Sequence, residues 1–183
     1  MNKTLLLVLA LMIAVCFTGC GEKTQDADVP SQTNENTPSQ EGEAPVQEES
    51  LYYYEANGTI IHTFDPAEEV LAALGEPLNT FEAESCAYQG MDLFYYYDGF
   101  ELTVNDIDGV DRVTVITVAD DTVAIPQGVK IGDSEEDMLA AMGDDYQAET
   151  GVYKFISANT LLQITVKEGA VSSIQYIYTP QQA

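Results

Sequence analysis

The sequence is poor in basic residues, and this scarcity excludes one class of partners. It holds six Lys and Arg against 31 Asp and Glu, a formal net charge of −25 at pH 7. Residues 51–183 hold four against 23, a difference of −19 charges. Proteins bind nucleic acids by neutralising phosphates, and they adhere to anionic lipid through basic clusters. We therefore predict no nucleic-acid partner. The acidic surface favours solubility, with attraction to a basic partner or to cations as the alternative.

Histidine, cysteine and tryptophan are also scarce: the chain has one His, three Cys and no Trp. His62 and Cys86 cannot complete the four ligands of a usual zinc site. A Cys–His dyad would need a cation or a helix N-terminus to stabilise the thiolate, and its surroundings are acidic. The sequence has neither a Gly-x-Ser-x-Gly elbow nor a phosphate-binding glycine loop. We predict no enzyme, no cofactor and no metal site, with a Cys86-dependent hydrolase as a lesser alternative.

No apolar run in the sequence is long enough for a membrane span. The run 5–17 has 13 residues, whereas a spanning helix needs about 20. It matches the apolar region of a secretory signal that ends at small residues. Phe17-Thr18-Gly19-Cys20 resembles the lipobox of bacterial lipoproteins. The resemblance implies a signal peptide over 1–19 and a lipid on the sulfur of Cys20; the alternative is an ordinary signal cut elsewhere.

Residues 21–50 contain no aromatic residue, no Leu and no Ile, so we predict a disordered acidic linker there. Together with the lipobox, this places the protein on the extracytoplasmic face of the cell membrane, attached through Cys20. Residues 51–183 form the predicted folded domain. Because Cys16 leaves with the signal and Cys20 takes the lipid, Cys86 has no partner for a disulfide.

Two segments repeat each other at an offset of 68 residues. Residues 65–75 and 133–143 are identical at six of eleven positions. Each copy begins with Asp followed three residues later by Glu, the pattern of a capping box. Each ends with Gly, which suits the residue after a helix. We predict two short helices whose structural capping residues are Asp65, Glu68, Gly75, Asp133, Glu136 and Gly143.

Alternating apolar residues predict antiparallel strands after each helix. We therefore expect an α+β domain of two tandem helix-plus-antiparallel-sheet units, about 51–123 and 124–183. Residues 105–111 look like a calcium loop, but the glycine comes too early for an EF-hand. A hairpin turn at Asp108-Gly109 is the better interpretation. The predicted strands cover 52–55, 59–63, 86–88, 93–97, 100–104, 112–118, 152–156, 161–166 and 171–178.

The segment Gly128-Val129-Lys130-Ile131-Gly132-Asp133, with Glu136 and the helix end at 139–143, resembles the start of a repeated unit in known proteins. These are the β-lactamase-inhibitory-protein-like proteins and the small envelope lipoproteins of the BamE (SmpA/OmlA) type. The stretches 85–88 and 96–100 are similar to acidic lipoproteins of Gram-positive anaerobes. The inhibitor's paired cysteines are absent, so no inhibitory contact residue carries over.

Tyrosines cluster at 52–54 and 95–97. Alternation along a strand sends Tyr95 and Tyr97 to one face and Tyr96 to the other, and tyrosine is favoured in recognition surfaces. We predict a binding surface that includes Tyr53, Tyr95 and Tyr97, with simple β-propensity as the alternative. The predicted function is a protein-binding or scaffold module for an envelope or secreted partner. Inhibition of a secreted enzyme is the alternative, by architecture alone.

Overall fold

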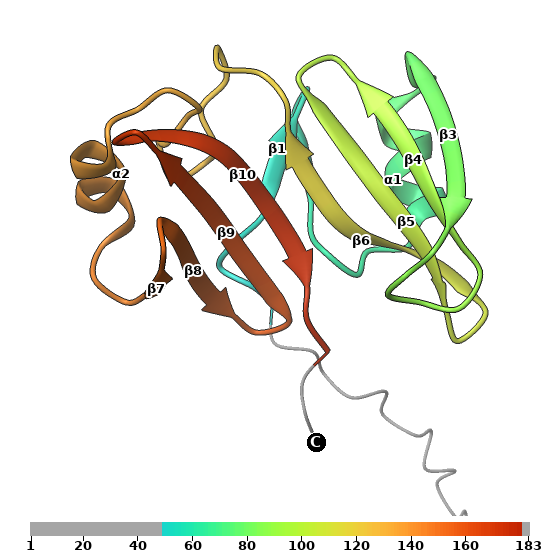
Figure 1. Cartoon of the computed structure of the whole chain (residues 1–183). Helices are drawn as coiled ribbons and strands as arrows, with labels where there is room; N and C mark the ends of the chain where they lie inside the picture. The colour runs from blue at the N-terminus through green and yellow to red at the C-terminus, as the bar shows by residue number, and fades with distance from the viewer. Residues whose placement is uncertain (1–48, 181–183) are drawn as a thin grey trace, which may run out of the picture. The chain divides into compact units, whose positions relative to one another are not determined.

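Eight strands of the chain form one antiparallel sheet in the order β3-β4-β5-β6-β10-β9-β8-β7 (Figure 1). The computed structural model describes residues 49–180, all within one unit of the chain. The predicted signal peptide, Cys20 and most of the predicted linker lie outside these residues. The strands are β3 (Asn79–Glu84), β4 (Met91–Tyr97), β5 (Phe100–Ile107), β6 (Val110–Val118), β7 (Gln147–Glu149), β8 (Val152–Ser157), β9 (Thr160–Lys167) and β10 (Ala170–Tyr178).

The predicted α+β fold of two helix-plus-sheet units is wrong, because the described chain is mostly β and its large sheet is continuous. Two four-stranded meanders, β3–β6 and β7–β10, meet where β6 pairs with β10. The pairing runs from Val118–Ile174 to Val115–Ile177. Backbone hydrogen bonding therefore crosses the expected boundary between the units. The predicted strand at 86–88 is also wrong, since these residues belong to the β3–β4 connection.

The two predicted helices are present. They are α1 (Ala67–Leu74) and α2 (Glu135–Met142). Gly75 and Gly143 follow them with φ of 79° and 82°, and their amides donate to the carbonyls four residues earlier at 3.0 and 2.9 Å. Both glycines therefore follow their helices with a positive φ, which glycine adopts without steric cost. Neither helix is long and apolar enough to cross a membrane, within the residues that the structure describes.

The predicted Asp–Glu capping boxes are wrong. The residue before α1 is Pro66, which makes no side-chain cap, and α2 is capped by Ser134, whose hydroxyl accepts from the Asp137 amide at 3.1 Å. Asp65 and Asp133 instead each close a turn that precedes the helix. Their carboxylates accept from the amide three residues earlier, at 2.8 Å for Asp65 and 2.9 Å for Asp133. The two aspartates therefore orient the chain before each helix rather than cap it.

Both helices pack on the same face of the sheet, which we call the covered face. The hairpin β1 (Tyr54–Ala56) and β2 (Thr59–Ile61) packs there too, because the Tyr54 ring lies 5.0 Å from the Phe100 ring and 6.2 Å from the Tyr176 ring. The opposite face, which we call the open face, carries no helix (Figure 1). The largest fully buried side chains are Tyr176, Phe155, Ile61, Leu102, Ile116, Met138, Leu162, Ile164 and Ile174.

The hydroxyl of Tyr176 is a polar group without a hydrogen-bond partner in the described core. The side chain is fully buried, the hydroxyl has no hydrogen-bond partner within residues 49–180, and burial raises its pKa far above the ordinary value. An unsatisfied buried polar group costs about 1–3 kcal/mol. We expect Tyr176→Phe to leave the free energy of unfolding unchanged or to raise it, as measured by urea denaturation. The control is Tyr97→Phe, which removes a 3.1 Å bond to the Gly75 carbonyl and should lower it by about 1 kcal/mol. A loss at Tyr176 as large as at Tyr97 would contradict the assignment.

Candidate functional site

The structure places two of the predicted binding tyrosines on the covered face. Tyr95 and Tyr97 are half-buried and pack against the core. Tyr97 stacks on Phe100, with ring centroids 5.1 Å apart. Residues at α1 lie against this face of β4, since the Tyr97 hydroxyl donates to the Gly75 carbonyl and α1 residues line a hollow with Tyr95. Tyr53 is on a separate part of the domain, with its ring 5.7 Å from the His62 ring.

Tyr95 nevertheless lies in a hollow. The space between α1, β4, β5 and the β5–β6 turn has a volume of about 400 Å³. Its floor is apolar, with contributions from Leu71, Val104 and Val110, and Val110 is 41% exposed. Its remaining lining residues are Pro66, Ala67, Glu68, Tyr95, Gly109 and Asp111.

A second hollow of about 210 Å³ shares one lining residue, Tyr95, with the first. It runs over β3 and β4. By strand alternation, Thr80, Glu82, Leu93 and Tyr95 belong to the covered face, and they make up four of its six lining residues. We call the two hollows together the Tyr95 groove. The groove reaches from the start of α1 to the outermost strand of the sheet.

The charged residues that line the Tyr95 groove are all acidic. Glu68, Glu82 and Asp111 carry the carboxylates, and no Lys or Arg of the described part of the chain lines either hollow. Arg112 follows Asp111 in sequence but is held elsewhere. Its guanidinium lies 4.2 Å from the centre of the Phe64 ring and donates to the Phe64 carbonyl at 2.9 Å. The groove therefore combines an apolar floor, an aromatic ring and uncompensated negative charge.

The second half of the sheet shows why the groove is open only in the first half. At the 68-residue offset, which also aligns the starts of β3 and β7, Tyr146 corresponds to Leu78. Tyr146 packs on Tyr153 and Phe155, with ring distances of 5.2 and 5.6 Å. Tyr153 lies opposite the second residue of β7, just as Tyr95 lies opposite the second residue of β3. Tyr153 is only 9% exposed. Leu78 is 74% exposed and does not cover Tyr95 as Tyr146 covers Tyr153. The first half therefore has a groove at the position where the second half packs Tyr146 against Tyr153.

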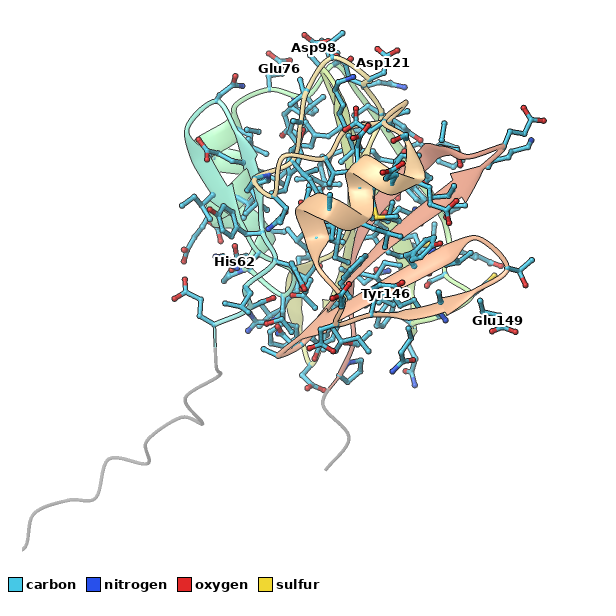
Figure 2. All side chains as sticks on the ribbon, turned by 90° about the vertical axis from the view of Figure 1, so that its left-hand side faces the viewer. His62, Glu76, Asp98, Asp121, Tyr146 and Glu149 are labelled. Carbon is cyan, nitrogen blue, oxygen red and sulfur yellow. The ribbon has the colours of Figure 1, made fainter. Side chains whose placement is uncertain are left out.

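Other carboxylates are dispersed on loops. Figure 2 shows Glu76, Asp98 and Asp121 at one end of the domain, on the connections that follow α1, β4 and β6, with their oxygens pointing outward. Within residues 49–180, no three His, Cys, Asp or Glu side chains gather as a metal site would require. These carboxylates contribute to the overall charge of the domain and form no site of their own.

His62 and Cys86, the two residues of the alternative hydrolase hypothesis, lie on different elements. Cys86 is exposed in the β3–β4 connection. His62 follows β2 and lines a polar hollow of about 310 Å³ with Glu49, Ser50, Thr63, Phe64, Asp65 and Asn159, and Cys86 is not among these residues. The imidazole Nε2 lies 3.5 Å from a Glu49 oxygen, and the buried Nδ1 has no partner within the described chain. Nothing in this arrangement would activate the Cys86 thiol.

Asp65 in this hollow provides a pH-dependent contribution to stability. Burial raises the pKa of its carboxyl above 3.8, opposed by the bond from the His62 amide. A raised pKa in the folded state favours the protonated form, so this contribution is full below pH 3.8 and is lost as pH rises through the raised pKa. Asn at this position can still accept the His62 bond and does not titrate. We expect Asp65→Asn to gain stability relative to the parent chain as pH rises through that window.

The measurement is urea denaturation at a series of pH values. Asp133→Asn is the matched control, because Asp133 makes the equivalent turn bond but also lies 3.4 Å from the Lys130 ammonium. That exposed pair is worth about 0–1 kcal/mol, so the control variant should lose stability near neutral pH. A constant difference between Asp65→Asn and the parent chain at every pH would contradict the assigned titration.

Comparison of the chain with protein-family models, with curated proteins and with solved structures found no match. The resemblances to bacterial lipoproteins and to the β-lactamase-inhibitory-protein-like and BamE-type proteins therefore stay predictions.

Proposed function

We propose that the chain is a lipid-anchored extracytoplasmic binding module that holds a basic segment of an envelope or secreted protein in the Tyr95 groove. The observation that carries this proposal is the combination of a half-buried tyrosine, an apolar floor and three carboxylates with no base among the lining residues. The lipobox-like segment ending at Cys20 supports the anchor, although it lies outside the described residues.

The groove matches the chemistry of a Lys or Arg side chain. Such side chains bury their methylene stems on apolar surface and keep the charged end outside, here over Leu71, Val104 and Val110. A cation is attracted to the face of an aromatic ring when it lies within about 6 Å of the ring centre. Tyr95 supplies such a ring. Glu68 and Asp111 then accept charge-assisted hydrogen bonds. The −19 charge of residues 51–183 attracts a basic partner over a longer distance and raises its association rate.

The test is a titration of the chain with two synthetic peptides, one of alternating Lys and Val and one of alternating Glu and Val, followed by fluorescence anisotropy. We expect only the lysine peptide to bind, and we expect its affinity to fall as salt is raised from about 0.05 to 0.5 M, because salt screens exposed charge pairs. Equal binding of both peptides, or no binding of either, would contradict the proposal.

The contribution of the groove carboxylates is tested by the double variant Glu68→Gln with Asp111→Asn. Exposed ion pairs contribute about 0.2–1 kcal/mol each, so loss of both should lower affinity for the lysine peptide about two- to thirtyfold. The matched control is Asp144→Asn with Asp145→Asn, two exposed residues after α2 that change the net charge by the same amount. Equal losses in the two double variants would mean that the peptide senses only net charge.

A further inference from the structure

We infer that the basic partner segment binds as an added strand along the outer edge of β3, extending the eight-stranded sheet by one strand. This inference rests on the proposed function and specifies how the partner lies. The Tyr95 groove ends on β3, and β3 is the outermost strand of its half of the sheet. A partner that fills the groove thus lies beside the unpaired backbone of this strand.

The edge of β3 lacks most of the usual protections against strand addition. Natural edge strands are short, bulged, interrupted by Pro or protected by charged side chains, and of these β3 has only the charges of Glu82 and Glu84. β3 pairs with β4 over all six of its residues, Asn79–Glu84, without a bulge, and contains neither Pro nor Lys. The opposite edge strand, β7, has three residues. Phe81 on β3 is 56% exposed and adds apolar surface on the open face. The structure therefore leaves one long, regular edge uncovered.

The register determines which amides face the edge. The Ser85 amide donates to the Gly90 carbonyl at 3.0 Å. In an antiparallel pair the direction of the amides alternates, so Phe81 and Ala83 direct theirs to β4, and Thr80 and Glu82 direct theirs outward. These outward-facing residues are the ones whose side chains belong to the groove side of the strand. Backbone pairing and side-chain recognition therefore occur at the same positions.

Two kinds of strand could pair with this edge: β3 of a second copy of the chain, or a basic segment of a partner protein. The charges on β3 favour the basic segment. Pairing with β3 of a second copy would bring Glu82 and Glu84 close to the same carboxylates of the other chain, and like charges on paired strands are destabilising. A strand with Lys or Arg opposite Glu82 gains instead. The open-face positions of β3 are Asn79, Phe81 and Ala83, so the partner strand should alternate basic residues on the groove side with apolar residues on the other. An alternating basic–apolar strand satisfies both faces.

The test compares Glu82→Pro with Glu82→Gln in the whole chain, using the alternating Lys–Val peptide as the probe. Both variants remove the carboxylate, but only proline removes the outward amide, and proline is tolerated on an edge strand when its N–H would face solvent. We expect Glu82→Pro to bind the peptide at least fivefold more weakly than Glu82→Gln, while both keep the parent circular dichroism spectrum. In the parent chain, peptide should slow hydrogen exchange at the amides of Thr80 and Glu82.

The outcomes separate this inference from the proposed function. If the lysine peptide binds, but the two Glu82 variants bind it equally and β3 gains no protection from exchange, strand addition is wrong and groove binding stands. If the lysine peptide does not bind the parent chain, both are wrong. If Glu82→Pro fails to fold, the exchange rates of the parent chain decide alone. A block peptide with three Lys followed by three Val should bind more weakly than the alternating one, and equal affinity would count against a strand.

Discussion

Replacing Tyr95 with alanine is expected to weaken binding of the lysine peptide about thirtyfold. Tyr95 lines both hollows of the groove, and truncation of a central aromatic residue in a binding surface commonly costs 2 kcal/mol or more, which corresponds to about a thirtyfold change. The Tyr95 ring supplies both apolar surface and a face for the cation. Affinity is measured by fluorescence anisotropy well below the unfolding temperature of the variant.

The matched control for this prediction is Tyr96→Ala. Tyr96 is the next residue of β4 and its side chain lies on the open face, opposite Glu101 on β5. Removing it should change affinity less than twofold. Tyr95→Leu separates the two contributions of the ring, because leucine keeps apolar contact and loses the attraction to the cation, which is worth about 0.5–1 kcal/mol at an exposed site. Equal losses at Tyr95 and Tyr96 would place the peptide outside the groove.

The largest expected effect on stability is that of Phe155→Ala. Phe155 on β8 is fully buried and contacts the Tyr146 ring at 5.6 Å. Truncating a buried phenylalanine costs about 3–5 kcal/mol, a large share of the 5–15 kcal/mol that holds a typical domain. Urea denaturation followed by circular dichroism measures the loss.

Ile156→Ala is the control for this prediction. Ile156 is the neighbouring residue on β8, its side chain lies on the open face, and it is 57% exposed. We expect it to cost less than about 1 kcal/mol, because little apolar surface is lost from the interior. The difference between two adjacent positions tests which face of β8 is buried. Equal losses would contradict the assignment of the covered face.

The helices could be predicted from the sequence because their signals are local. The 68-residue repeat predicted both, and the glycines marked both ends. The capping boxes failed because a serine was available one position later at Ser134, and because Asp65 and Asp133 are used in the preceding turn. A cap assigned from spacing alone cannot distinguish these uses, since the competing acceptor and donor lie within three residues of each other.

The strands at the two edges could not be predicted. Asn79–Glu84 and Gln147–Glu149 contain Asn, Glu and Ala, which are depleted in strands. Pairing with a neighbouring strand determines these segments more than their own composition does. The opposite error occurred at 86–88, where the Ser85 hydroxyl accepts from the Ala87 and Tyr88 amides at 3.3 and 3.0 Å and holds the chain in a turn.

The Tyr95 groove shows the limit of sequence patterns for the functional site. Alternation correctly separated Tyr95 from Tyr96, but it could not tell which face α1 would cover. Glu68 came from the helix pattern, Asp111 appeared only as the end of the calcium-loop-like stretch 105–111, and Glu82 carried no signal. Only the folded sheet brings the three to one groove. The groove is open because the first half has Leu78 at the position where the second half has Tyr146. This difference is found only when the 68-residue repeat is extended beyond the helices.

The central claim is that the Tyr95 groove binds a basic extended segment. It is tested most directly by methyl chemical-shift mapping of the chain during titration with the alternating Lys–Val peptide. The account predicts saturable shifts of the Leu71, Leu93, Val104 and Val110 methyl groups that line the groove, and loss of these shifts in Tyr95→Ala. Shifts confined to Ile156 and Leu161 on the open face, or no shift at any methyl group, would contradict it.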